Sequence, residues 1–238
     1  TTLSGLDMTG SIAYGTVETL NIGLGSVADT FTIASTHAGA TNVNGNNGSE
    51  IFNILSTSGP TTINGGTGDE TFNVGSNAAG TVATPNINTG GNVNSIGNDS
   101  GDVLMLNGDD PTSGSDWLYV DDTTGDTLGN TGTLTSTAIT GLGMAGSITY
   151  TTIEHLNIAL GSDGDTFTIE STHSGETVLN ANAGADIVNV RTISGITTVN
   201  GGDGSDTINV GTNAQGSIAT PNNNAGGTVP SPSAEAVP

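Results

Sequence analysis

The sequence predicts an all-β protein: a right-handed parallel β-helix or β-solenoid with about 20–21 residues per coil, in two tandem copies. Three observations lead to this prediction. Apolar and polar residues alternate over short stretches, glycine-rich turns closed by an acidic residue recur at a regular interval, and the whole pattern returns a second time along the chain. A helical interpretation fails because the apolar period is 2 and because Thr, Val, Ile and Gly are frequent. The right hand follows from the general preference of parallel crossover connections.

A long internal duplication sets the domain organisation. The segment Gly5–Ile12 recurs as Gly141–Ile148. The same offset in position number relates Tyr14 to Tyr150, Glu18 to Glu154, Phe31 to Phe167, His37 to His173 and Pro85 to Pro221. We therefore divide the chain into a first solenoid repeat (1–97), linking coils (98–136), a second solenoid repeat (137–229) and a flexible tail or junction (230–238). No obvious linker separates the copies, so we expect one continuous solenoid.

Within each copy, three acidic residues close successive turns, one per coil. They are Asp29, Glu50 and Glu70 in the first copy and Asp165, Asp186 and Asp206 in the second. Apolar residues keep the same spacing, so coils stacked about 4.8 Å apart would place Phe31, Phe52 and Phe72 in one interior column. Such a column lets few aromatic residues fill a thin core.

Amide side chains and connecting segments complete the expected architecture. Asparagines that precede the turns are expected to form hydrogen-bonded ladders: Asn44, Asn64, Asn180 and Asn200. Residues 84–97 are expected to form a protruding loop, because their pattern is irregular and rich in Gly, Asn and Pro. Strands should resume at 102–106 and 117–120, on either side of the loop-forming sequence NGDDPTSGSD.

The charge balance excludes several functions. The chain carries 23 acidic residues and one basic residue, Arg191, for a net charge of −22. A phosphate backbone or an anionic membrane surface would be repelled, so we expect no nucleic acid partner. No run is long and apolar enough for membrane insertion, and the absence of cysteine excludes disulfides and thiolate metal sites. Metal cations are the natural counter-charge.

One turn carries a specific motif. The stretch Gly201–Asn209, GGDGSDTIN, fits the nonapeptide G-G-x-G-x-D-x-U-x, in which U is a large apolar residue. Its glycines allow a tight turn, Asp206 adds a carboxylate where the turn carbonyls converge, and Ile208 is expected to point into the core. The turns GGTGDE and LGSDGD are variants of this motif. With these turns, the chain resembles the haemolysin-type (RTX) calcium-binding repeats of secreted bacterial proteins. The longer pattern from Trp117 to Ile169, which begins WLYVDDTTGDT and ends LGSDGDTFTI, also resembles units found in tandem in very large bacterial surface proteins.

The resemblance implies export without disulfides, folding on contact with extracellular calcium, and Ca²⁺ held between consecutive turns by carboxylates and turn carbonyls. The candidate metal ligands are Asp29, Glu50, Glu70, Asp69, Asp102, Asp121, Asp163, Asp165, Asp186, Asp203 and Asp206. Carboxylates stacked about 5 Å apart repel by roughly 1–3 kcal/mol per pair, and a cation with six to eight oxygen ligands reverses the sign, which favours Ca²⁺ over Mg²⁺. The chain departs from the family in having one motif turn per coil and in using Glu at positions 50 and 70.

Some residues have simpler interpretations. Gly, Asp and Asn also make good turns without any metal. The acidic cluster of Asp121, Asp122 and Asp126 is explained as well by solvated turn residues as by a calcium site. His37 and His173 lack a ligand partner nearby in sequence and are expected in surface loops rather than at zinc.

We therefore expect a calcium-stabilised extracellular structural or adhesive repeat protein of the bacterial cell surface, and not an enzyme. It would serve as a surface-layer, matrix or filament subunit that self-associates head to tail, with cell-surface polysaccharide as a second candidate partner. The alternatives are an ice-binding solenoid and a β-helix that binds or cleaves polysaccharide. Residue 1 is Thr and no secretory signal is visible, so a processed product, a piece of a longer protein and an export substrate with its signal elsewhere all remain open.

Overall fold

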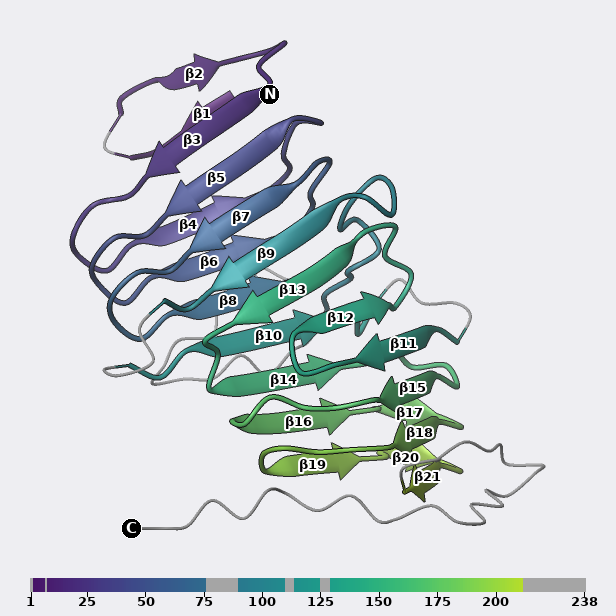
Figure 1. The fold of residues 1–238 in the computed structure, drawn as a ribbon. Coiled ribbons are helices and arrows are strands. Elements are labelled where there is room, and N and C mark those ends of the chain that lie inside the picture. Colours follow the sequence, from purple (N-terminus) through teal and green to yellow (C-terminus); the bar gives the residue numbers. More distant parts are fainter. Residues whose placement is uncertain (1, 7, 76–89, 110–113, 125–128, 212–238) are drawn as a thin grey trace, which may run out of the picture.

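The computed structural model describes residues 2–6, 8–75, 90–109, 114–124 and 129–211, and within these ranges it contains strands and no helix. It follows that no helix of the described chain could cross a membrane. Most strands belong to two large sheets that face each other (Figure 1). The prediction of an all-β protein with long parallel sheets, as in a β-helix, is confirmed. The tail at 230–238, Asp126 and residues 84–89 of the expected loop lie outside the described residues.

The larger sheet has ten strands. In spatial order these are β21 (Thr207–Val210), β18 (Ile187–Val190), β15 (Thr166–Ile169), β11 (Thr131–Leu134), β12 (Ala138–Gly141), β13 (Ser147–Thr151), β9 (Val103–Asn107), β7 (Thr61–Asn64), β5 (Ala40–Asn44) and β3 (Thr19–Gly23). All neighbours pair in parallel except β12, which is antiparallel to both β11 and β13. A single reversed strand therefore interrupts an otherwise parallel sheet.

The second sheet has seven strands, all parallel. Their order is β19 (Thr197–Asn200), β16 (Glu176–Asn180), β14 (His155–Ala159), β10 (Trp117–Asp121), β8 (Thr71–Val74), β6 (Ile51–Ile54) and β4 (Thr30–Ile33). Two small sheets complete the described fold: antiparallel β1 (Thr2–Ser4) with β2 (Ser11–Ala13), and parallel β17 (Ala183–Gly184) with β20 (Asp203–Gly204). Strands β9 and β10 confirm those expected near 102–106 and 117–120.

The apolar core lies between the two large sheets. Phe31, Phe52 and Phe72 are register partners on β4, β6 and β8, which confirms the predicted column, and the rings of Phe52 and Phe72 stack with centroids 5.3 Å apart. The same core continues through the joining strands and into the second copy, as far as Val190. Ile208, expected in the core, is instead 46% exposed, because β21 is the last described strand of its sheet and nothing described stacks beyond it.

Amide ladders run along both sheets, as predicted. The Asn64 amide donates to Asn44 Oδ1 at 2.7 Å, and the Asn200 amide donates to Asn180 Oδ1 at 2.8 Å. The first ladder extends one step further, because Asn107 donates to Asn64 Oδ1 at 2.7 Å. These side-chain bonds fix the register of neighbouring strands in addition to the backbone ladder.

The two copies exchange sheets. In the first copy the strands that precede the acidic turns, such as β5, belong to the ten-stranded sheet, whereas in the second copy their equivalents, such as β16, belong to the seven-stranded sheet. The two sheets run in opposite directions (Figure 1), so the acidic turns of the first copy lie at one edge of the protein and those of the second copy at the other. In one continuous solenoid, equivalent turns would stack at a single edge, and the exchange of sheets instead separates the acidic turns of the two copies.

Candidate metal-binding edges

The first acidic edge consists of Asp29, Glu50, Glu70, Asp116 and Glu154, which directly precede the strands β4, β6, β8, β10 and β14 of the seven-stranded sheet. Two pairs of adjacent members are joined by backbone-to-carboxylate hydrogen bonds. The Glu70 N–H donates to Asp116 Oδ1 at 2.8 Å, and the Asp116 N–H donates to Glu154 Oε2 at 2.8 Å. The stacking of turns therefore brings together side chains that are distant in sequence.

The second acidic edge consists of Asp165, Asp186 and Asp206, each before a strand of the ten-stranded sheet. It repeats the same bonding pattern. The Asp165 N–H donates to Asp186 Oδ1 at 2.7 Å, and the Asp186 N–H donates to Asp206 Oδ1 at 3.1 Å. In Asp116 and Asp186 one carboxylate oxygen is thus bound to the neighbouring turn, which holds the second oxygen in a fixed place.

Several carboxylate oxygens of the two acidic edges are buried without a donor. Glu50, Glu70, Asp116 and Asp186 are all 0% exposed. No group among the described residues donates a hydrogen bond to either carboxylate oxygen of Glu50 or Glu70, to Asp116 Oδ2 or to Asp186 Oδ2. Buried carboxylates are costly unless they are paired, hydrogen-bonded or bound to a metal, so this pattern needs a positive partner or a proton.

Glycines leave the space that these carboxylates occupy. A Cβ added to Gly45 would lie 2.7 Å from Glu50 Oε2 and 2.1 Å from the carbonyl oxygen of Gly65 in the next turn. A Cβ on Gly108 would likewise lie 2.1 Å from Asp116 Oδ2 and 2.2 Å from the carbonyl oxygen of Thr152. A carboxylate oxygen and a carbonyl oxygen of the neighbouring turn therefore converge beside each glycine. This pairing of hard oxygens suits Ca²⁺.

A cation at these edges would depend on main-chain oxygens. Among the described residues, no group of three or more His, Cys, Asp or Glu side chains gathers into a metal cluster. The carboxylates are strung along each edge, one per turn, and so present one or two oxygens to any point between turns. The residues fit a cation that takes its remaining ligands from turn carbonyls and water, as Ca²⁺ commonly does.

Burial changes the protonation of the first acidic edge. It raises the pKa of the Glu50 carboxyl to about 6, and the negative charge of Asp29 adds to this rise. Burial also raises the pKa of Glu70, with a further contribution from the charge of Asp116. The pKa of Asp116 is raised by burial as well, against the opposing effect of the Glu70 N–H that donates to it. At the second edge, burial raises the pKa of Asp186.

These pKa shifts predict that the stability of the metal-free protein decreases as the pH rises. Between the unfolded pKa of Glu50, 4.5, and its folded value of about 6, the unfolded chain is ionised while the folded chain keeps the proton. Stability should therefore fall as pH rises through this window, by about 2 kcal/mol from Glu50 alone. Protein dialysed free of divalent cations should show a lower melting temperature at pH 7.5 than at pH 5.

Saturating calcium should reverse that trend, because metal binding requires the deprotonated carboxylate. Melting temperatures measured by circular dichroism at both pH values, with and without calcium, test whether stability falls with pH in the metal-free protein and rises with pH in the calcium-loaded protein. A metal-free melting temperature that rises with pH would contradict the burial of unpartnered carboxylates at this edge.

The remaining predicted ligands lie in different surroundings. Asp69 is half-buried beside the first acidic edge, and its Oδ1 accepts the Ser115 N–H at 2.9 Å. Asp102 accepts the N–H of Asn98 at 2.8 Å, a local turn bond. Asp163 is half-buried and Asp203 is exposed, both within the turns of the second acidic edge.

Asp121 is better placed than its spacing suggested. It ends β10 on the same side as the second acidic edge and is 0% exposed. Its Oδ1 accepts the hydroxyl of Thr123 at 2.7 Å, whereas no described group donates to its Oδ2. A Cβ on Gly91 would lie 2.4 Å from that Oδ2, so a glycine again makes room for the carboxylate. The neighbouring Asp122 is 1% exposed and accepts the side-chain amide of Asn130 at 3.2 Å.

Asp116 and Glu154 were not expected at the first acidic edge. The turn before Asp116 is longer than the others, so the regular spacing is lost there, and the turn before Glu154 lacks the glycine motif. One signal could have found Asp116: it directly precedes the strand Trp117–Asp121, as Glu50 and Glu70 precede theirs.

The two equivalent loop histidines each contact a tyrosine ring. His37 and His173 lie edge-on to Tyr14 and Tyr150, with ring centroids 5.8 and 5.9 Å apart. Both are half-buried, and burial lowers the pKa of His173. Both lie in loops, as expected, and each loop folds its imidazole against the tyrosine of the same copy.

Comparison with known proteins adds no relative: no family model, no curated protein and no solved structure matches the chain.

Proposed function

We propose that the chain is a calcium-stabilised extracellular structural repeat, wound as a right-handed parallel β-solenoid and used as a surface, matrix or filament unit. The observation that carries this proposal is the burial of Glu50 and Glu70 with no described donor to either carboxylate. The chain has a single basic side chain, and Arg191 pairs with Glu170 rather than with either acidic edge. The counter-charge must then come from outside the chain or from protons.

Each acidic edge would bind calcium with its own set of ligands. At the first edge, Glu50, Glu70 and Asp116 would supply carboxylate oxygens, and carbonyls such as that of Gly65 would supply further ligands. At the second edge, Asp186 and Asp206 would do the same with their own turns. Bound calcium would supply positive charge that neutralises the stacked carboxylates and links successive turns. Folding would therefore be coupled to arrival in a calcium-rich medium outside the cell.

The strand register favours this structural role over ice binding. Ordered rows of outward Thr residues would be needed to template water, but Thr30 is followed across the sheet by Ile51, and Thr32 by Asn53. In the second copy Thr166 and Thr168 continue as Thr131 and Thr133 on β11, but Ile187 and Asn189 follow on the other side, so the rows cross at most two strands there. Thermal hysteresis in a cooled solution of the protein would favour the ice-binding alternative, and release of reducing ends from polysaccharides would favour an enzyme.

Chelation provides the direct test of the proposal. We expect EGTA to lower the melting temperature by on the order of 10 °C, because each site saturated at 100 times its Kd contributes about 2.7 kcal/mol. Added Ca²⁺ should restore the circular dichroism spectrum and the melting temperature, and equimolar Mg²⁺ should restore much less. If protein shown by elemental analysis to be metal-free melts at the same temperature as calcium-loaded protein, the proposal is wrong.

A further inference from the structure

The N-terminal end of the protein has an internal template. Strands β1 to β4 are the first-copy equivalents of β12 to β15. The match extends to the pairing: Leu3 is the register partner of Ile12 in the β1–β2 hairpin, as Ile139 is of Ile148 in the β12–β13 hairpin. The middle of the protein therefore shows what the N-terminal end looks like when it is covered.

In the middle, each of these strands has an additional neighbour. Strand β13 pairs with β9, β14 pairs with β10, and both β12 and β15 pair with β11. All three neighbours come from Val103–Leu134, which we call the joining segment. The corresponding edges of β1, β2, β3 and β4 pair with no described strand. Their backbone N–H and C=O groups are open to strand addition.

Burial differs accordingly between equivalent side chains. Ile12 is 51% exposed, whereas its equivalent Ile148 is 0% exposed and faces Leu104 of β9. Leu6 is 44% exposed, whereas its equivalent Leu142 is 1% exposed. The joining segment thus accounts for the covering of one apolar face, and the same face at the N-terminal end lacks that cover.

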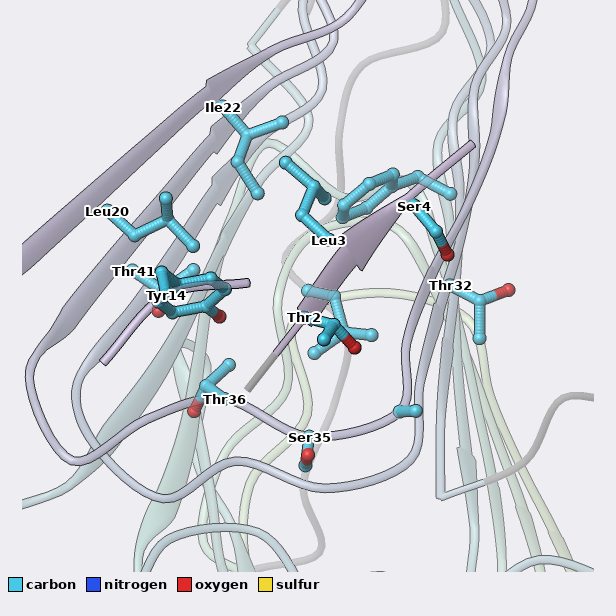
Figure 2. Close-up of a pocket in the computed structure, with 13 residues that line it drawn as sticks. Thr2, Leu3, Ser4, Tyr14, Leu20, Ile22, Thr32, Ser35, Thr36 and Thr41 are labelled. Atoms are coloured by element: carbon cyan, nitrogen blue, oxygen red, sulfur yellow. The ribbon is translucent and has the colours of Figure 1, made fainter. Parts of the chain in front are cut away.

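A cavity of about 340 Å³ opens at this end (Figure 2). It lies inside β1, β3 and β4, and its apolar lining includes Leu3, Tyr14, Leu20, Ile22 and Phe31. In the second copy the equivalents of these five residues are buried in the core, which also contains Leu106, Leu118, Val120 and Leu134 of the joining segment. The cavity marks the space that those joining-segment side chains fill in the middle of the protein.

We infer that the N-terminal face, formed by β1 to β4, is a docking surface for the joining segment of another repeat unit placed ahead of this one. The occupant is a three-strand segment with the character of Val103–Leu134, which places apolar side chains such as Leu104, Leu106 and Leu134 in the core. The chain contains one such sequence, and that copy already lies between its own two repeats. This inference rests on the proposed role as a repeat unit only for the identity of the partner.

A fusion tests the inference on the full chain. A second copy of residues 94–136 is placed ahead of residue 1, which reproduces the order found in the middle of the protein. We expect backbone amides of β2 and β3 to exchange with deuterium at least tenfold more slowly than in the parent, and binding of the dye ANS to fall. A fusion whose added copy carries Leu104→Ser, Leu106→Ser and Leu134→Ser is the matched control and should give parent-like exchange.

The substitution Ile12→Ser separates docking from general stabilisation. It should leave the melting temperature of the parent within about 2 °C, because Ile12 is half-exposed there, and should lower that of the fusion by several degrees. Unchanged exchange in the fusion, or an equal effect of Ile12→Ser in both proteins, would overturn the inference. So would burial of the same face in the parent by stacking of a second chain, detected by light scattering. The chelation experiment uses the parent alone. The fusion experiment therefore still tests the docking surface if the calcium proposal fails.

Discussion

Neutralising three carboxylates of the first acidic edge should make the metal-free protein more stable and remove most of its response to calcium. The variant Glu50→Gln/Glu70→Gln/Asp116→Asn keeps the shape of each side chain and removes the charge. Burial already pushes the pKa of all three upward, so the ionised forms are disfavoured in the folded state. For Glu50 alone the cost at neutral pH is about 2 kcal/mol, and we expect the variant to melt roughly 5–10 °C higher than the parent in EGTA.

In saturating calcium the order should invert. The variant offers no carboxylate oxygen at these three positions, so it gains little from calcium at the first edge while the parent gains at both edges. The variant Glu18→Gln is the matched control, because Glu18 is exposed and occupies, in the first copy, the position of Glu154 in the second. Thermal melts of the three proteins in EGTA and in calcium measure whether the triple variant is more stable than the parent without calcium and less stable with it. A triple variant that is less stable than the parent in both media would show that these carboxylates make direct stabilising contacts and hold no cation.

The elements that could be predicted are those fixed by spacing. Phe52 and Phe72 stack because a regular step along the sequence returns the chain to the same place in the next turn, and Asn44 and Asn64 form their ladder for the same reason. Glu50 and Glu70 were found by the same rule. Periodicity is enough here because each regular coil contributes one strand to each large sheet and contacts mainly the coils next to it.

The exchange of sheets between copies could not be predicted from spacing. Strands β11, β12 and β13 follow one another within the same sheet through two reversals, and β14 then enters the opposite sheet from β3, its equivalent in the first copy. One local signal was present: the connection from Leu134 to Ala138 is very short, and so short a connection allows antiparallel pairing alone. The composition of these strands matches that of the parallel ones, so composition does not mark the reversal.

The hydrogen bonds that join successive turns at the acidic edges could not be predicted from the sequence either. A turn sequence places a carboxylate near its own carbonyls, but the bond from the Asp165 N–H to Asp186 Oδ1 joins two different turns. Whether a carboxylate is then buried depends on how closely the next turn approaches. That distance is set by the glycines, which makes them the most sensitive positions of the structure.

Replacing Gly68 by Ala should be among the most damaging single substitutions in the chain. The added Cβ would lie 1.8 Å from the carbonyl oxygen of Gly48 in the preceding turn, and φ at this position is +147°. Since the obstructing atom belongs to the backbone, the two turns must separate, and separation also moves Glu70, whose Oε1 would lie 3.0 Å from the new Cβ. Strain and displaced packing together predict a loss of about 3–5 kcal/mol.

Substitutions at two other glycines distinguish backbone strain from the steric clash between turns as causes of that loss. Gly90 has φ of +89° but no atom of the described residues within 4 Å of an added Cβ, so Gly90→Ala should cost only the backbone strain, about 1 kcal/mol. Gly10 has neither the positive φ nor a nearby described atom, and Gly10→Ala should be close to neutral. Urea unfolding in calcium ranks the three variants. If Gly68→Ala lost no more than Gly90→Ala, the close approach of successive turns would not be a source of stability, and cations bridging those turns would lose their geometric basis.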